Sequence, residues 1–372
     1  MGLQTLHSPP MHKTLIALAA LTAASPALPQ ASAAIAAGKA QPSPLAPSEI
    51  VAQAPKADWT GIAASDLLVM DLAPDAKGKP RRVVIQLMPA PFSQGWIGNI
   101  RKLAVARFWD GTAINRVQDN YVVQWGDPNA EDKAKAKPMP TGLRQMPEAE
   151  YSARYSSSMF TQRYTPWGQR AAIVPRGPMT VAIDPTPGSS FADAYAISVG
   201  FAAGFPIAMS YPARSNYTDP RTETDDDRPD FVWPVHCYGM VGVGRDLSPN
   251  TGSGAELYVV IGHAPRHLDR NIALVGRVIE GIEHLSSLPR GKGTLGFYDP
   301  KQGDRRTPIR KIRLGGEVQG LPAYEYLSTE SGSFAKYADA RANRRDAFFI
   351  RPAGGADICN IPVPVRRSTG SR

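Results

Sequence analysis

The sequence has few cysteines and lacks the motifs of several common enzyme classes. Only two of its 372 residues are cysteine, and its six histidines form no HExxH pattern, so we expect no metal site. It contains no GxxxxGK followed by Ser or Thr, no GxGxxG between a strand and a helix, and no GxSxG, which argues against P-loop, dinucleotide-binding and serine-hydrolase chemistry. A membrane-spanning helix needs about 20 apolar residues, and we expect no such span in the mature chain.

Charged residues are also sparse, whereas proline is abundant. Charged residues make up 20% of the chain and apolar residues 42%, which is enough to build a core. The 35 prolines favour loops and short strands over long helices. The 42 basic residues exceed the 33 acidic ones, but they lie in small separate groups such as Arg81-Arg82. We therefore interpret the net charge of +9 as a solvated basic surface and expect no nucleic-acid binding.

The N-terminal residues have the pattern of a targeting segment. Lys13 precedes an apolar run from Leu15 to Ala24, and Ala31-Ser32-Ala33 supplies the small residues of a cleavage site. We interpret residues 1–33 as a signal peptide, which predicts a periplasmic or secreted protein after cleavage. Residues 34–60 are rich in Ala, Pro and Ser, and we predict that they form a flexible linker without packed structure.

Export changes the interpretation of the two cysteines, Cys237 and Cys359. An isolated pair can form a disulfide in an oxidising compartment, and two buried free thiols are the alternative. The disulfide would close a loop of about 120 residues. We predict that it ties the C-terminal segment to the rest of the chain.

Short apolar segments separated by turn residues predict a fold that is mainly β. Two segments have helical spacing instead, one from Ser93 and one over Glu280–Leu288. Two early strands, a helix, several strands, a helix and a last strand indicate a closed β-barrel with a helix at each end. The predicted strands are Asp66–Leu72, Arg81–Leu87, the two halves of Ile114–Gln124, Met179–Ile183, Tyr238–Val243, Leu257–Ile261, Ile272–Val278 and Pro308–Leu314.

One predicted hairpin, Phe108 to Asp127, combines three side chains of functional interest. Asp119-Asn120 is a turn signal between its two halves. Arg116, Tyr121 and Gln124 would then place a cation, an aromatic ring and an amide on one surface.

This hairpin also resembles part of a known family, the cyclophilin-type peptidyl-prolyl cis-trans isomerases. Together with Arg82–Leu87 and Asn99, it is similar to the family's opening strand, helix and F-H-R-V-I-x-x-F-M-x-Q-G-G-D signature. Two later blocks follow in the family's order. Gly239–Arg245 with Gly254–Val260 is similar to the bacterial G-x-x-x-M-A-R…S-Q-F-(F/Y)-I segment, and Leu268–Glu283 is similar to L-D-x-x-(H/Y)-x-V-F-G-x-V-x-x-G-M.

The resemblance implies a closed eight-stranded barrel capped by two short helices, over residues 61–317. It leaves residues 129–230 as an insertion that is not typical of the family, and residues 318–372 as a C-terminal extension. We expect partial order in the insertion, because a structureless loop of that length is uncommon in a compact domain.

The resemblance also implies a site on the hairpin and on the later blocks. Arg116 matches the catalytic arginine, Tyr121 the floor of a proline pocket, and Gln124 the residue that orients arginine and substrate. The residues that the resemblance implies in substrate binding are Val122, Gly244, Arg245, Glu256, Tyr258, His267 and Leu268.

The chain departs from the family pattern around this site. Glu256 stands where glutamine is usual, and its negative charge near Arg116 could hold the guanidinium in an ion pair or pull it away from substrate. The other departures are Asn115 for histidine, Val122 for methionine, Trp125 for glycine, His267 for tryptophan or phenylalanine, and Ile272 for histidine.

The implied function is isomerisation of X–Pro bonds in exported proteins, which assists their folding and needs no cofactor. The substrates would be proline-containing polypeptides. A different class of function stays open, that of a catalytically weak proline-peptide-binding or chaperone-like module. The sequence does not indicate an oligomeric state.

Overall fold

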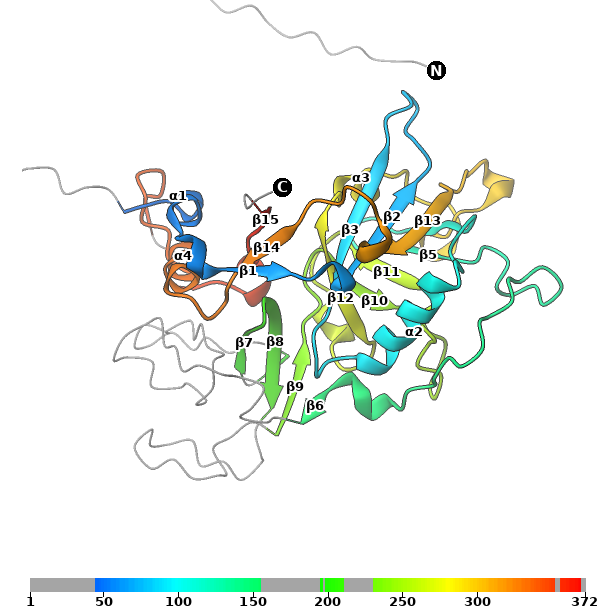
Figure 1. Ribbon diagram of the computed structural model, residues 1–372, viewed down its shortest axis with the longest axis horizontal. Helices are drawn as coiled ribbons and strands as arrows, with labels where there is room; N and C mark the ends of the chain where they lie inside the picture. The colour runs from blue at the N-terminus through cyan, green and yellow to red at the C-terminus, as the bar shows by residue number, and fades with distance from the viewer. Residues whose placement is uncertain (1–43, 155–194, 197, 211–229, 352–354, 369–372) are drawn as a thin grey trace, which may run out of the picture. The chain divides into compact units, whose positions relative to one another are not determined.

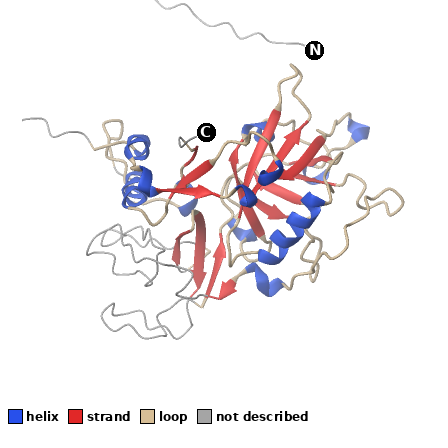
Figure 2. Cartoon of the chain, in the orientation of Figure 1, coloured by secondary structure: helices blue, strands red, loops and turns tan. Residues whose placement is uncertain are grey.

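Antiparallel sheets of short strands make up most of the protein, and Figure 2 shows that helices are the minor element. Figure 1 shows the computed structural model, which describes residues 44–154, 195–196, 198–210, 230–351 and 355–368. The predicted strand Met179–Ile183 and the predicted signal peptide lie outside these residues. Within the described ranges, no helix is long and apolar enough to cross a membrane.

Eight strands form one antiparallel sheet that curves into a barrel (Figure 1). The strand order is β13-β2-β3-β12-β10-β11-β5-β4, so strands from distant parts of the sequence are neighbours. Each of these strands overlaps a segment that was predicted as a strand. The strands are β2 (Leu67–Leu72), β3 (Arg81–Leu87), β4 (Ala113–Val117), β5 (Val122–Gly126), β10 (Met240–Val243), β11 (Leu257–Val260), β12 (Leu274–Glu280) and β13 (Ile309–Leu314).

The first and last strands of the sheet, β13 and β4, meet at one end and nearly close the barrel. The N–H of Ile309 donates to the carbonyl oxygen of Thr112 over 2.8 Å, and the N–H of Ile114 donates to that of Thr307 over 2.9 Å. These bonds pair backbone groups that would otherwise form open sheet edges. The prediction of a mainly β, eight-stranded barrel is confirmed.

Successive residues of the barrel strands alternate between the interior and the outer face. In β5, Val123 and Trp125 are fully buried in the main core, whereas Gln124 between them is only half-buried. In β11, Leu257 belongs to the main core and Tyr258 belongs to a separate apolar cluster. The outer face of these two strands is therefore the surface available for a site.

Helix α2 (Gln94–Val105) buries Trp96 and Ile100 in the main core and contacts β13. The second helix on the barrel, α3 (Glu283–Ser286), is shorter than the predicted segment because Gly281 has a left-handed φ of 85° and cannot continue a helix backwards. Short 3₁₀ helices are η1 (Lys56–Asp58), η2 (Ala64–Asp66), η3 (Glu148–Tyr151), η7 (Arg266–Leu268), η8 (Thr294–Gly296), η9 (Pro300–Gln302), η10 (Gly315–Glu317) and η11 (Ile358–Asn360).

Two smaller antiparallel sheets are formed by residues outside the barrel strands. Part of the predicted insertion forms strands of a four-stranded sheet in the order β6-β9-β8-β7, and the two ends of the described chain form a three-stranded sheet in the order β1-β14-β15. The strands are β6 (Ala153–Arg154), β7 (Ser198–Ala202), β8 (Phe205–Ser210), β9 (Phe231–Pro234), β1 (Trp59–Ile62), β14 (Tyr324–Leu327) and β15 (Val365–Arg367).

The prediction of an unpacked linker over residues 34–60 is wrong for the part that the structure describes. Helix α1 (Pro47–Gln53) packs against α4 (Gly332–Ala342), and its Ile50 contacts the main core. Strand β1 then begins at Trp59, which is buried. The partners of this segment come from the far end of the chain, so its local composition gave no indication of them.

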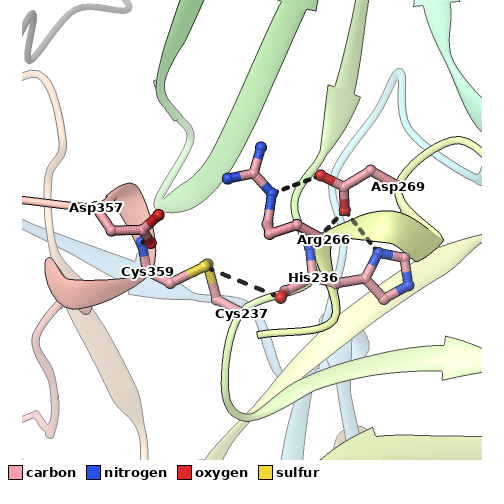
Figure 3. Close-up of a disulfide and its surroundings, with 6 residues drawn as sticks. All are labelled: His236, Cys237, Arg266, Asp269, Asp357 and Cys359. Carbon is pink, nitrogen blue, oxygen red and sulfur yellow. Dashed lines mark hydrogen bonds and ion pairs between the residues drawn. A yellow bond between two sulfur atoms is a disulfide. The ribbon is translucent and has the colours of Figure 1, made fainter. Parts of the chain in front are cut away.

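A disulfide joins Cys237 to Cys359, which confirms the predicted pairing and replaces the alternative of two free thiols (Figure 3). Cys237 lies between β9 and β10, and Cys359 lies in η11. The bond links positions separated by 122 residues, with the two Cα atoms 5.0 Å apart. It therefore fastens the C-terminal segment to the residues that enter the barrel at β10.

Candidate active site

A row of residues crosses four neighbouring strands on the outer face of the barrel. Gly242 of β10 faces Tyr258 of β11, Tyr258 faces Gln124 of β5, and Gln124 faces Arg116 of β4. Opposed residues in antiparallel strands lie close enough for their side chains to interact. Gly242 leaves room for the tyrosine ring, since a Cβ atom there would lie 2.3 Å from the Tyr258 hydroxyl oxygen. The sheet thus unites Arg116, Gln124 and Tyr258, three of the predicted site residues.

The guanidinium of Arg116 lies beside two aromatic rings. Its Cζ atom is 5.5 Å from the centroid of the Tyr121 ring and 5.3 Å from that of the Phe297 ring, which are cation–π distances. Burial lowers the pKa of Arg116 below its ordinary value, and the guanidinium nevertheless stays charged at neutral pH. The rings hold a partly desolvated cation in place.

Three hydrogen bonds fix the direction of the Arg116 side chain. Nε donates to the carbonyl oxygen of Leu295 over 2.7 Å, Nη1 donates to Gln124 Oε1 over 3.3 Å, and Nη2 donates to Gln118 Oε1. A guanidinium has five N–H groups. Among its contacts with the described residues, these bonds leave two N–H groups for a bound molecule.

Gln124 connects Arg116 to Glu256. Its Nε2 donates to Glu256 Oε2 over 2.9 Å, while its Oε1 accepts from Arg116. Burial raises the pKa of the Glu256 carboxyl above its ordinary value, although the hydrogen bond from Gln124 opposes this rise. Gly244 adjoins the pair, because a Cβ atom there would lie 3.2 Å from Glu256 Oε2. Glu256 thus orients the arginine through the amide of Gln124.

A small apolar cluster lies next to this polar row. Val122, Tyr258 and Val260 are buried, and Tyr121 and Ile272 pack against them. Val122 faces Val260 across β5 and β11, two positions along from the pair formed by Gln124 and Tyr258. The predicted pocket residues Tyr121, Val122 and Tyr258 are therefore together with Ile272, one of the departures from the family pattern, and the structure adds Val260. The Arg116 guanidinium therefore lies beside an apolar surface.

The hydroxyl of Tyr258 points to a buried histidine that the sequence did not single out. Tyr258 Oη lies 2.8 Å from His236 Nε2, and the two rings are nearly parallel, with an angle of 10° between them. His236 is fully buried and Tyr258 is 5% exposed. Burial raises the pKa of the Tyr258 hydroxyl well above its ordinary value, so it stays protonated.

His236 is held in turn by Asp269, as Figure 3 shows. Asp269 Oδ1 lies 2.8 Å from His236 Nδ1, and Asp269 Oδ2 accepts from Arg266 Nε over 2.7 Å. Burial lowers the pKa of His236 below its ordinary value and outweighs the opposing effect of Asp269, so the ring is neutral at neutral pH. We infer that Nδ1 carries the proton and donates to Asp269, which leaves Nε2 to accept from Tyr258.

Three predicted substrate-binding residues lie apart from these contacts. Nε of Arg245 donates to the carbonyl oxygen of Asn271 over 2.9 Å, so its side chain is directed to that loop. In η7, His267 is exposed and Leu268 is half-buried. Leu268 is not a member of the apolar cluster around Tyr258.

Two of the departures from the family pattern lie inside the barrel wall. Trp125 is fully buried in the main core. Asn115 is 9% exposed, and its Nδ2 donates to the carbonyl oxygen of Gly126 over 3.2 Å. These residues act on the packing behind the site, and Glu256 is the departure that takes part in the polar row.

The sequence-based prediction did not identify six residues of this region: Gln118, His236, Arg266, Asp269, Leu295 and Phe297. Asp269 belongs to the L-D pair of the third block, and this was the available signal for it. The histidine was set aside because it belongs to no metal-binding pattern, and the two residues that contact the Arg116 side chain from the segment between β12 and β13 have no motif around them.

The structure thus combines an antiparallel eight-stranded barrel with a row of residues from β4, β5, β10 and β11 that places an arginine beside an apolar cluster. The family model for cyclophilin type peptidyl-prolyl cis-trans isomerase/CLD matches residues 81–312, which is more than half of the chain. The protein belongs to the cyclophilin-type peptidyl-prolyl cis-trans isomerase family. Its enzyme class is therefore peptidyl-prolyl cis-trans isomerase, and the suspected resemblance is confirmed.

The fold is similar to that of a solved structure. Cyclophilin AquaCyp293 from Hirschia baltica matches with a TM-score of 0.57 and 20% sequence identity, over 84% of this chain and 95% of that chain. A cyclophilin type peptidyl-prolyl cis-trans isomerase from Cryptosporidium parvum, whose crystal structure was obtained in the presence of the dipeptide ala-pro, covers 68% of this chain and 98% of that chain, at 10% identity and a TM-score of 0.32. A comparison with curated proteins gives no match.

Proposed function

We propose that the protein isomerises X–Pro bonds of exported polypeptides at the site formed by Arg116, Gln124 and the apolar cluster around Tyr258. One observation carries this proposal. The Arg116 guanidinium is fixed by Gln124 beside the rings and aliphatic side chains of that cluster, with two N–H groups left among its described contacts. A prolyl ring on the apolar surface would bring its amide nitrogen toward the cation.

The chemistry of the reaction fits these two features. An X–Pro bond rotates over a barrier of roughly 18–20 kcal/mol, because the C–N bond has partial double-bond character. A donor directed at the prolyl nitrogen binds its lone pair and weakens that character. The lone pair is most available when the bond is twisted, so the hydrogen bond from Arg116 stabilises the transition state more than the substrate. No covalent bond is made or broken and no cofactor takes part.

Gln124 and Glu256 have positioning roles in this proposal. An arginine side chain is flexible, and orienting it in advance reduces the entropy lost on reaching the transition state. The bond from Gln124 to Glu256 fixes which end of the amide faces Arg116, because Nε2 is used on the carboxylate and Oε1 remains as the acceptor.

Arg116→Ala tests the catalytic role. We expect kcat/KM for a short X–Pro peptide to fall at least tenfold, since a hydrogen bond from a charged donor contributes about 1.5–3 kcal/mol and each factor of ten needs about 1.4 kcal/mol. Arg310→Ala is a suitable control, because Arg310 is an exposed arginine of β13 and lies outside the described contacts of the site. Exchange spectroscopy by NMR on the peptide would measure both variants.

Equal rates for wild type and Arg116→Ala, both near the uncatalysed rate, would contradict isomerisation at this site. Titration of the peptide would then decide on the alternative function. Binding without catalysis would identify a proline-peptide-binding or chaperone-like module, which the engagement of Arg116 by Leu295, Gln118 and Gln124 would explain.

Export to the periplasm or the medium is the second part of the proposal. Its support is the signal-like pattern of residues 1–33 and the disulfide, a bond typical of oxidising compartments. Expression of the chain in a bacterium with subsequent fractionation tests it. We expect a periplasmic protein whose N-terminal sequence begins at Ala34, and a cytoplasmic protein with its N-terminus intact would contradict export.

A further inference from the structure

Arg277 of β12 is a buried cation on the outer face of the barrel. Only 8% of its surface is exposed, and its neighbour across the strands is Gln86 of β3. Among the ion pairs of the described residues, none includes Arg277. Burial lowers its pKa to about 10, and the opposing influence comes from Tyr326 rather than from a carboxylate. Buried charges are ordinarily paired, so a cation without a counter-ion calls for an explanation.

The described contacts of the Arg277 guanidinium use only some of its N–H groups as hydrogen-bond donors. Nε and Nη2 both donate to Gln86 Oε1, over 3.0 and 2.8 Å. The rings of Phe205 and Tyr326 have their centroids 4.8 and 5.7 Å from Cζ. Within the part of the chain that the structure describes, Nη1 has no hydrogen-bond acceptor. Three of the five N–H groups, two on Nη1 and one on Nη2, are therefore without a described acceptor.

A cavity of about 240 Å³ adjoins this residue. Arg277 is the one charged residue among the described residues that line it, and most of the other lining residues are apolar. They include Met240 of β10 and, from the C-terminal segment, Ile361 and Val363. The Cys237–Cys359 disulfide shown in Figure 3 forms part of the wall.

The cavity is accessible from outside. Tyr238 belongs to its lining and is 51% exposed, so this side of the cavity reaches the surface. A charged donor in an otherwise apolar, open cavity is the arrangement of a ligand site, where few polar groups orient a molecule and apolar walls hold its remainder.

We propose that this cavity binds a small aliphatic monocarboxylate, with its carboxylate on Nη1 of Arg277 and its hydrocarbon chain against Met240, Ile361 and Val363. A carboxylate supplies the missing counter-ion and matches the planar fork of a guanidinium. The cavity has about the volume of eight liquid water molecules, which corresponds to an acid with roughly eight non-hydrogen atoms, such as hexanoate. A doubly charged phosphate would find no second cation among the described lining residues.

Calorimetric titration of the oxidised mature protein with sodium hexanoate tests this proposal, with hexan-1-ol and hexylamine as probes of equal chain length. We expect hexanoate to bind, the alcohol to bind at least tenfold more weakly, and the amine not to bind. Arg277→Met should weaken hexanoate binding at least tenfold, because it keeps an apolar side chain of similar length and removes the charge. Arg310→Met is the matched control for non-specific attraction of anions to this basic protein.

Three results would contradict the proposal of a carboxylate-binding site at Arg277. Equal binding of hexanoate and hexan-1-ol would show that the charge plays no part. Unchanged hexanoate binding by Arg277→Met would place the acid elsewhere on the protein. Absence of hexanoate binding at millimolar concentrations would leave Arg277 with a purely structural role between Phe205 and Tyr326. Isomerase activity of Arg277→Met on a short X–Pro peptide is expected to equal that of wild type and reports that the variant is folded.

Discussion

At the scale of single residues, the candidate site contains a hydrogen bond between the hydroxyl of Tyr258 and the buried ring of His236. A ring without a hydroxyl group could fill the same place in the apolar cluster. The Tyr258 hydroxyl is buried there, and without a hydrogen-bond partner it would destabilise the cluster. His236 removes that difficulty because its Nε2 accepts from the hydroxyl, while Asp269 holds the other ring nitrogen. We therefore expect the histidine to act on the site through the position of the Tyr258 ring.

A double-mutant cycle measures this positioning effect. We expect His236→Ala to lower kcat/KM for a short X–Pro peptide about five- to tenfold, in line with a net contribution of about 1 kcal/mol from one hydrogen bond. The same change should have little effect on protein that already carries Tyr258→Phe, since the hydroxyl is then absent. Initial-rate measurements on the four proteins give the coupling energy directly.

His236→Gln supplies the control, because its amide oxygen can accept from Tyr258 and its NH₂ group can donate to Asp269. It should recover most of the activity that the alanine variant loses. An equal loss from His236→Ala with and without the Tyr258 hydroxyl would show that the histidine affects the whole fold rather than the ring.

At the scale of elements, local patterns predicted most of the barrel. The strands were found because β2, β3, β11 and β13 are short, largely apolar segments separated by turn residues in the sequence. The hairpin of β4 and β5 was found for the same reason, together with the turn residues between its halves. The predicted lengths of elements were less accurate where a single residue determines where an element begins. Gly281 is an example, because its left-handed φ excludes it from α3.

Elements that depend on distant partners could not be predicted in this way. Helix α1 lies in a segment whose composition resembles a linker, and it is stabilised by α4, nearly 300 positions later in the chain. The candidate site shows the same limit. Arg116 and Gln124 were found from one hairpin and a family resemblance, whereas the contacts with Leu295 and Phe297 come from a segment without a motif.

At the scale of the whole molecule, the disulfide is a covalent cross-link between the barrel and the C-terminal segment. Its loop of 122 positions gives it a large effect on the unfolded state, since a cross-link over such a length removes about 5 kcal/mol of chain entropy at 25 °C in the simple model. The same segment contributes Ile358 and Ile361 to the main core, so it is packed as well as linked.

Replacement of both Cys237 and Cys359 by serine is therefore expected to lower the free energy of unfolding by up to about 5 kcal/mol. Urea denaturation followed by tryptophan fluorescence measures the change. Wild-type protein treated with a reductant is the control, and it should unfold near the midpoint of the double variant. Coincident midpoints for the oxidised, reduced and substituted proteins would contradict a stabilising role of the disulfide.

The three-stranded sheet has a consequence for the order in which the protein can fold. Ile62 of β1 pairs with Tyr324 of β14, which follows it by 262 residues. A ribosome that adds about 5–20 residues per second needs roughly 13–50 seconds to synthesise that interval. During this time β1 has no native partner, whereas β2 and β3 can pair as soon as both have emerged. We therefore expect the sheet that joins the two ends of the described chain to form after the pair of β2 and β3, and a nascent chain halted before Tyr324 to present β1 as an unpaired strand to chaperones.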